Sequence, residues 1–173
     1  MIFNPDNPLI VQGDGSLLLE VDNDRYAEVR DFLARFADLE KSPEHIHTYR
    51  ITALSLWNAA GAGLTVDELA EGLRRYTKYE LPRKVLEDVA EKIGRFGKVV
   101  LRASDDDPDM LLMEVADKQV ARKVATSKRV FAQTAGAVRE GLFRVPLLHR
   151  GTIKQAMLKL GYPVDDHAGF VAG

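Results

Sequence analysis

The stretch TVDELAEGLRRYTKYELPRKVLEDVAEKIGRFGKVVLR, residues 65–102, carries two helical patterns followed by a strand pattern. Thr65 with Glu68 three residues later is typical of a capping box, and the apolar residues after it recur at helical spacing. Pro82 stands where the first turn of a helix tolerates proline, and a second apolar stripe follows it. The β-branched residues at the end of the stretch predict a strand over 98–102. The stretch therefore predicts two amphipathic helices and the first strand of a hairpin.

The residues on either side extend this pattern to three helices and a complete hairpin. Before the stretch, Thr52 can cap another helical segment, which glycines stop at Gly61. After it, residues 104–109 are rich in turn formers and residues 110–115 are apolar, as expected for a loop and a second strand. Three helices followed by a hairpin is the order of a winged helix-turn-helix, although many other small α+β domains share it.

The N-terminal residues predict a β-hairpin, a helix and a further strand. Two apolar segments, 9–11 and 17–21, flank a Gly-Asp-Gly turn whose glycines supply positive φ. Asp22 and Asp24 are the expected caps of the helix that follows. Residues 46–51 are rich in β-formers and are predicted as a short strand.

The last third of the chain predicts a small mixed α/β unit. A helix is expected over residues 118–125 and extended segments over 129–132 and 142–145. A final helix is expected to begin with a cap at Thr152 and to end at Gly161.

Charge is distributed unevenly in a chain of ordinary globular composition. The 173 residues are 46% hydrophobic and 29% charged with a formal net charge of −2, which excludes disordered, collagen-like and coiled-coil classes. Residues 118–159 hold ten basic residues and one acid, Glu140, and the acidic DDDPD run at 105–109 precedes them. This shift predicts an α+β fold of two small domains. The first, 1–116, is a hairpin plus helices with a winged-helix-like unit, and the second, 117–173, is a small basic mixed α/β domain.

Several function classes are not expected. Without cysteine there is no disulfide, thiolate zinc site or catalytic thiol. No signal-peptide pattern is present, and no stretch approaches the roughly 20 apolar residues of a membrane span, so we expect a cytoplasmic protein without a membrane partner. No GxxxxGK[ST] phosphate loop occurs, and Gly61-Ala62-Gly63 lacks the lysine that such a loop needs. We therefore expect no cofactor and a chain that is not itself an enzyme.

Three further features each admit a ligand interpretation and a simpler one. His45 and His47 stand two apart in a strand and could share a metal, but two ligands without companions favour surface histidines. Residues 105–109 lack the alternating spacing, the central glycine and the terminal glutamate of a calcium loop, so a solvated turn is expected. Trp57 lies among apolar residues at helical spacing and is expected in the core. No metal site is predicted.

The third helix of a winged-helix unit would present its first turns to DNA. Arg83 and Lys84 stand there and oppose the helix dipole, which favours a functional reason for them. Three acids share the solvent side with Lys84, and the wing would be the acidic 105–109 run, which phosphates repel. A surface for docking a protein partner is the better interpretation of this helix.

The basic segment is the predicted contact with nucleic acid. If six or more of its cations share a surface, they would bind a duplex backbone with a salt dependence of about 0.9 log unit per phosphate neutralised. The alternative is that they point in several directions or face an acidic protein surface. The predicted DNA-binding residues are Lys118, Arg122, Lys123, Lys128, Arg129, Arg144, Arg150, Lys154 and Lys159.

Three blocks of the sequence resemble one known family. NPLIVQGDGSLLLEVD at 7–22, followed by ARFADLEKSPEHIHTYRITALSLWNAAGAG at 34–63, resembles the N-terminal domain of bacterial XPB-type DNA repair helicases. IKQAMLKLGYPVDDHAGFVAG at 153–173 resembles the segment that closes their damage-recognition-like domain, before the first ATPase lobe.

The resemblance implies a parent enzyme that is an ATP-dependent 3′ to 5′ DNA helicase or translocase of superfamily 2, acting in nucleotide excision repair or transcription-linked duplex opening. The family continues into two motor lobes where this chain stops at Gly173, so none of its ATPase residues can be placed here. We expect a noncatalytic DNA-binding accessory module whose partners are duplex or damaged DNA and helicase motor domains or repair proteins. Two alternatives stay open: a protein-interaction or regulatory module that docks the motor or a repair partner, and a free-standing winged-helix transcription regulator, which the acidic wing disfavours.

Overall fold

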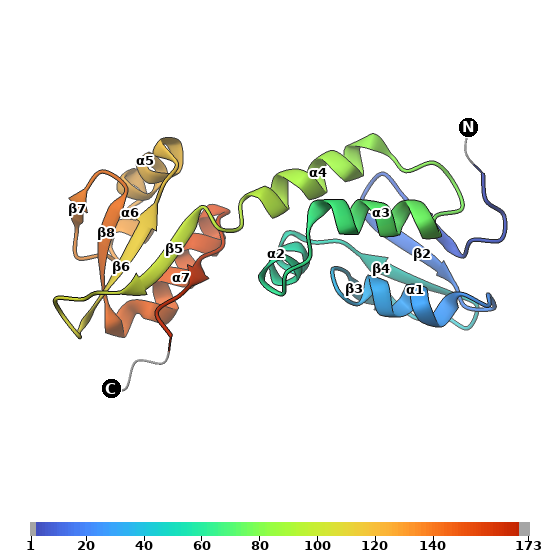
Figure 1. The fold of residues 1–173 in the computed structure, drawn as a ribbon, viewed down its shortest axis with the longest axis horizontal. Coiled ribbons are helices and arrows are strands. Elements are labelled where there is room, and N and C mark those ends of the chain that lie inside the picture. Colours follow the sequence, from blue (N-terminus) through green and yellow to red (C-terminus); the bar gives the residue numbers. More distant parts are fainter. Residues whose placement is uncertain (1–2, 170–173) are drawn as a thin grey trace. The chain divides into compact units, whose positions relative to one another are not determined.

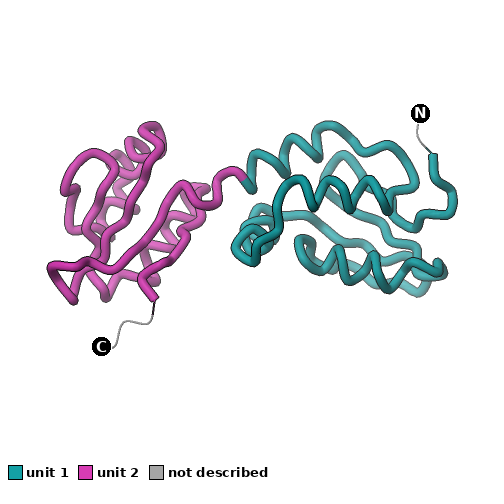
Figure 2. Tube along the Cα trace, in the orientation of Figure 1, with its two compact units in different colours: residues 1–93 teal, residues 94–173 magenta. Residues whose placement is uncertain are grey.

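The computed structural model describes residues 3–169 and divides into two compact units, unit 1 at 1–93 and unit 2 at 94–173 (Figure 2). Each unit combines helices with a sheet, so the predicted α+β fold of two small domains is confirmed. None of the helices within the described range is long and apolar enough to cross a membrane.

Unit 1, as far as the structure describes it, is an antiparallel sheet of order β1-β2-β4-β3 with helices packed on it (Figure 1). Its sheet and helices contribute to one hydrophobic core, in which Leu17, Leu33 and Leu69 are fully buried. Its elements are β1 Leu9–Val11, β2 Ser16–Glu20, α1 Tyr26–Leu33, β3 Asp38–Lys41, β4 Ile46–Arg50, α2 Ala53–Gly61, α3 Val66–Tyr76 and α4 Arg83–Gly94.

The predicted first hairpin and the three later helices of unit 1 are confirmed, and two threonines explain where helices begin. The Thr52 Oγ1 accepts a hydrogen bond from the Ser55 N–H at 3.0 Å, and the Ser55 Oγ accepts one from the Thr52 N–H at 2.9 Å. The Thr65 Oγ1 accepts from the Glu68 N–H at 3.2 Å. Each threonine satisfies an N–H that the start of a helix leaves without a backbone partner.

Two details of unit 1 differ from the prediction. Asp22 and Asp24 do not cap α1, which has no side-chain cap, and the turn before it is closed by Asn23, whose Oδ1 accepts from the Arg25 N–H at 2.8 Å. Strand β3 was not expected. Its four residues are all exposed, so the sequence lacks the alternation of buried and exposed positions that marks a half-buried strand.

Within residues 94–169, unit 2 contains helices and a five-stranded sheet of order β7-β8-β6-β5-β9, in which β9 runs parallel to β5 and the other pairs are antiparallel. Met113 pairs with Leu101 on one side and with Phe143 on the other, and these three buried side chains share a core with Val124 and Ile153 of the helices. The elements of unit 2 are β5 Val99–Ala103, β6 Met110–Val115, α5 Lys118–Thr126, α6 Lys128–Phe131, β7 Ala137–Arg139, β8 Leu142–Pro146, the 3₁₀ turn η1 Leu147–His149, α7 Arg150–Leu160 and β9 Asp165–Asp166.

The two compact units meet between Ile93 and Gly94 rather than at the predicted boundary between 116 and 117. The reason is that β6 pairs with both β5 and β8, so the β5–β6 hairpin lies inside the sheet of unit 2. The three helices and the hairpin of the expected winged-helix-like unit therefore fall into different compact units. The change of charge near residue 117 therefore affects the surface of unit 2, and residues on both sides of it belong to the same hydrophobic core.

Two local predictions in unit 2 are wrong. Residues 129–132 were expected to be extended, whereas Lys128–Phe131 is helix α6, begun by the Ser127 Oγ, which accepts from the Val130 N–H at 3.3 Å. Thr152 does not begin the last helix, because α7 starts two residues earlier. The predicted end at Gly161 is confirmed, and its φ of +102° explains why a glycine stands there.

Candidate nucleic-acid interface

All nine cations predicted to bind DNA lie in unit 2, where they are spread over four elements. Three stand on α5, two on α6, one on β8 and three on α7: Lys118, Arg122 and Lys123, then Lys128 and Arg129, then Arg144, then Arg150, Lys154 and Lys159. The structure gives these cations three different surroundings, and it does not bring all nine together on one free surface.

Two cations of α7 are engaged inside unit 2 by Asp166 of β9. The Arg150 Nε and Nη2 lie 2.8 and 3.0 Å from the two carboxylate oxygens of Asp166, and the Lys154 Nζ lies 2.5 Å from Oδ2. Burial alone would raise the pKa of Asp166, but the hydrogen bonds from Arg150 and Lys154 outweigh it and hold that pKa well below its ordinary value. These two cations fasten β9 to α7, so their charge is largely neutralised before any ligand arrives.

Two more predicted cations have weaker internal partners. The Arg144 Nη2 lies 3.9 Å from the Asp107 Oδ2, so the acidic loop between β5 and β6 partly offsets this charge. The Lys123 ammonium lies 5.5 Å from the centre of the Tyr162 ring, which the Arg95 guanidinium also approaches at 4.9 Å. A cation over an aromatic ring remains charged and available to a further anion.

The other five predicted cations are exposed and form no ion pair within residues 3–169; they are Lys118, Arg122, Lys128, Arg129 and Lys159. Asp117 caps α5 by accepting from the N–H groups of residues 119 and 120, and the helix then carries Lys118 and Arg122 one turn apart on the same flank. Both line a hollow of about 180 Å³ together with Arg139 of β7.

Sequence reasoning did not select Arg139 as a site residue. It is exposed and has no ion-pair partner in the described part of the chain. Its position in the basic segment was the one feature of the sequence that could have identified it. No local pattern indicates that β7 lies across the hollow from α5. The structure thus brings together Lys118, Arg122 and Arg139, whereas it ties Arg150 and Lys154 to Asp166.

The histidines and the acidic loop do not form a metal site in the described residues. His45 Nδ1 lies 2.9 Å from an Asp22 oxygen, and His47 Nδ1 lies 3.3 Å from the Tyr26 hydroxyl, so each has its own partner. No group of three or more possible ligands occurs within residues 3–169. In the acidic loop the Asp107 Oδ1 accepts from the Asp109 N–H at 2.9 Å, as in an ordinary turn.

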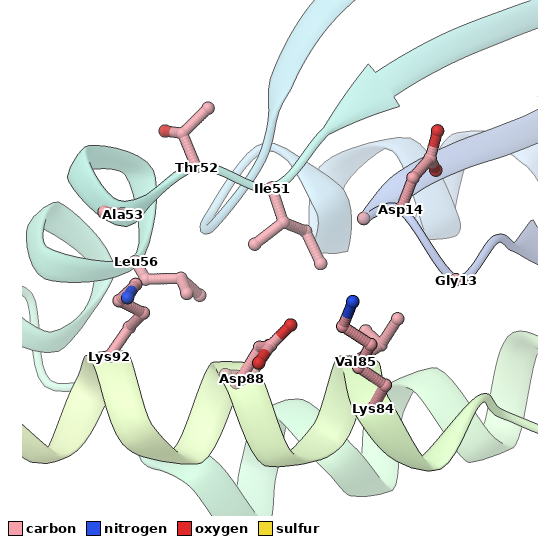
Figure 3. Close-up of a pocket in the computed structure, with 12 residues that line it drawn as sticks. Gly13, Asp14, Ile51, Thr52, Ala53, Leu56, Lys84, Val85, Asp88 and Lys92 are labelled. Atoms are coloured by element: carbon pink, nitrogen blue, oxygen red, sulfur yellow. The ribbon is translucent and has the colours of Figure 1, made fainter.

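Unit 1 has a hollow of about 310 Å³ between the β1–β2 turn, the start of α2 and the flank of α4 (Figure 3). Lys84 and Asp88 of α4 point towards Ile51, whose side chain points back towards α4, while the carboxylate of Asp14 in the turn points away from α4. Hydrogen bonds from the side chain and N–H of Ser16 lower the pKa of Asp14, which favours its charged form. With Lys92 the lining carries two positive and two negative groups, whereas the hollow of unit 2 is lined by three cations and one acid.

Trp57 is buried, as predicted, with 8% of its surface exposed. Its indole Nε1 donates a hydrogen bond to the Lys92 carbonyl oxygen at 2.9 Å, which ties α2 to α4. The side chain is therefore part of the core and not free for stacking on a ligand.

The sequence matches the family model described as "Helicase conserved C-terminal domain" over residues 9–138. It is 40% identical over 168 residues to the DNA 3'-5' helicase XPB of Kineococcus radiotolerans and 37% identical over 168 residues to that of Mycobacterium tuberculosis. Each of these alignments covers 97% of this chain and 30% of the relative. The general transcription and DNA repair factor IIH helicase/translocase subunit XPB of Encephalitozoon cuniculi is 28% identical over 165 residues, 95% of this chain and 24% of that protein.

These matches correct one expectation from the sequence. The chain was predicted not to be an enzyme because it lacks a phosphate-loop motif. The family match instead assigns residues 9–138 to a helicase domain, and the alignments with proteins named as helicases extend over 97% of the chain. A search for local motifs missed this, since a domain can belong to an enzyme family without the one loop that was sought.

Proposed function

The chain belongs to the helicase conserved C-terminal domain family, and from this premise we propose that it is a DNA-binding part of an XPB-type DNA repair helicase. The chain spans about 30% of the length of its bacterial relatives, so their activity comes to it only as part of this proposal. The proposal assigns unit 1 to the N-terminal domain and unit 2 to the damage-recognition-like domain of such helicases, with the boundary at residues 93 and 94 in place of the predicted 116 and 117. It includes a role in nucleotide excision repair and a cytoplasmic location.

The observation that carries the proposal is the set of unpaired cations on α5, α6 and β7. Lys118, Arg122, Lys128, Arg129 and Arg139 are exposed and form no ion pair within residues 3–169. Cations without an acidic partner bind phosphates without first breaking an internal contact, and each releases a counterion from DNA. If all five contact phosphates, the slope of log affinity against log salt is about −4.5.

A salt titration of duplex binding by fluorescence anisotropy tests the proposal. The double variant Lys118→Glu, Arg122→Glu is expected to bind more weakly and to lower the magnitude of the salt slope by about 2, because two phosphate contacts are lost. The matched control is Arg35→Glu, Lys41→Glu, which makes the same charge change at exposed residues of unit 1. Undetectable binding at low salt, or equal effects of the two double variants, contradicts the proposal.

A protein-docking role is a second candidate, favoured by an exposed aromatic pair on unit 1. Phe3 and Tyr79 are 53% and 48% exposed, and their rings stack with centroids 5.2 Å apart. Tyr79 also lines a hollow of about 320 Å³ with Arg74 and Arg83. Exposed aromatics beside arginine are enriched at protein interfaces. If this surface docks helicase motor lobes, Tyr79→Ser abolishes their capture in a pull-down while DNA binding stays unchanged, and unaltered capture excludes it.

A further inference from the structure

A small hollow in unit 2 combines an apolar interior with a cationic rim. It measures about 180 Å³ and lies between α5 and the segment from β7 to the start of β8. Helix α5 supplies one wall, where Ala121 and Ala125 stand one turn apart. Ala137 and Gly141 stand in the opposite wall, and the Phe143 side chain, 2% exposed, belongs to the same lining.

The local structure explains why this space is left open. The pairing of β7 with β8 is irregular between Ala137 and Arg139, where Val138 is an extra residue that is 55% exposed. Ala137 and Arg139, on either side of this irregularity, both line the hollow. Gly141 has a φ of +79°, and a Cβ there would lie 2.6 Å from the Val115 carbonyl oxygen, so this turn requires glycine. Alanines and a glycine thus border a space that larger side chains would fill.

The charges around the hollow are those of a site for a ligand with both an anionic group and hydrogen-bond donors. Lys118, Arg122 and Arg139 line it without ion-pair partners in residues 3–169, and Glu140 is the one acid among the residues that line it. A bare phosphate would match the three cations but not the carboxylate. A nucleotide matches both, since its phosphates face the cations and an exocyclic amine, such as that of cytosine, donates to a carboxylate.

We propose that this hollow binds one unpaired nucleotide of a DNA strand. The base enters between the alanines of α5 and β7, above the buried Phe143, and the flanking phosphates bind Lys118, Arg122 and Arg139. The volume admits one base and not a base pair, so a paired nucleotide has to leave the stack before it enters, and an unpaired one does so at the smallest cost. The inference rests on the proposed DNA binding and adds to it a preference for one class of substrate.

The experiment compares two short labelled duplexes that differ by a single unpaired cytosine, each titrated with the 173-residue chain. Burial of apolar surface between a base and the alanines of the hollow is expected to make binding of the duplex with the unpaired cytosine about 5- to 10-fold tighter. Ala125→Leu and Ala137→Leu fill the hollow from opposite walls without changing any charge. Each is expected to remove the preference and to leave affinity for the fully paired duplex unchanged.

The matched control is Ala132→Leu, an exposed alanine of unit 2 that does not line the hollow, and it should keep the preference. Thermal unfolding of each variant verifies folding, and two filling variants on different elements protect against a local defect. The same affinity of the unsubstituted chain for both duplexes, or a preference that survives both filling variants, overturns the inference alone. Absence of binding to either duplex overturns the proposed DNA binding itself.

Discussion

Asp166 shows how much the behaviour of unit 2 depends on one carboxylate. Its side chain is 14% exposed and accepts from two cations of α7 as well as from the Ala168 N–H at 3.0 Å. We expect Asp166→Asn to lower the free energy of unfolding at pH 7 by about 1.5–3 kcal/mol, the usual range for hydrogen bonds to charged groups. Urea unfolding measures this, and Asp165→Asn is the matched control, because that side chain is more exposed and pairs only with His167 among the described residues.

The same contact has a pH dependence with a definite sign. The pKa of Asp166 is depressed in the folded chain, so its contribution to stability is fully present above the ordinary pKa of about 3.9 and is lost as pH falls towards the folded pKa. The difference in unfolding free energy between the unsubstituted chain and Asp166→Asn should therefore shrink below about pH 4. A difference that stays constant down to pH 3 would show that the carboxylate charge is not the cause.

Gly141 is the residue at which a single methyl group should do most harm to the turn between β7 and β8. Gly141→Ala meets both an unfavourable positive φ and the Val115 carbonyl oxygen. Gly136→Ala has a similar φ of +97° but open space around the added Cβ. We expect Gly136→Ala to cost about 1–2 kcal/mol through the backbone alone and Gly141→Ala to cost more. Equal unfolding free energies of the two variants would show that the close approach has no effect.

The residue-level predictions that succeeded have partners near in the sequence, although the caps expected from Asp22, Asp24 and Thr152 did not form. Thr52 and Thr65 bond to N–H groups three residues away, so the cap could be inferred from the spacing. Arg139 and Asp166 are placed beside their neighbours by the pairing of β7 and β9 with other strands. A short stretch of sequence does not predict such pairing. The nine cations were therefore identified by type and segment, but which of them are neutralised could not be predicted.

At the level of elements, helix α2 depends on a reciprocal cap. Thr52→Ala removes the acceptor for the Ser55 N–H and is expected to lower the unfolding free energy by about 0.5–2 kcal/mol. Thr65→Ala is the comparison, and we expect a smaller effect because the Glu68 side chain there meets the threonine hydroxyl and not its N–H. Thermal or urea unfolding measures both. An equal or larger effect at Thr65 contradicts this ranking.

The elements with the clearest signal in the sequence are those with a long apolar pattern. Helices α3 and α4 carry apolar stripes over several turns, and β6 alternates buried and half-buried residues along its whole length. Helix α6 is one turn of KRVF and β3 is fully exposed, so neither has a period that a sequence window can detect. Short elements form because their neighbours hold them, and their sequences alone do not specify them.

At the scale of the whole molecule, two boundaries along the chain do not coincide. The second compact unit begins at Gly94, whereas the basic segment begins near residue 117, about 23 residues later. Residues 94–173 expressed alone should unfold in one cooperative thermal transition, whereas residues 117–173 should not, because they lack β5 and β6. Leu111 and Met113 of β6 are almost fully buried at the centre of the sheet, and their loss leaves the helices without a core. Circular dichroism of the two fragments checks this, and a cooperative transition of 117–173 would restore the boundary predicted from charge.

Strand pairing therefore separates what could be predicted from what could not. The α+β class and most elements follow from local patterns, whereas the unit boundary depends on the long-range β6–β8 pairing of Met110 to Glu114 with Leu142 to Pro146. The helicase relationship was predicted from resemblance and is confirmed at the level of the family, while the search for nucleotide-binding motifs led to the wrong conclusion about enzyme membership.

The position of strand β9 also determines how unit 2 would respond to tension along the chain. The chain enters the sheet at the beginning of β5 and leaves β9 at its far end, and the two strands are parallel neighbours. Tension applied between residues 94 and 169 would thus slide one strand along the other, so that the contacts between them, including the 2.7 Å bond from the His167 N–H to the Leu101 oxygen, carry the load together instead of opening one by one. The ion pairs of Asp166 join the same edge strand to α7, so a force along this edge would load them together with the strand contacts.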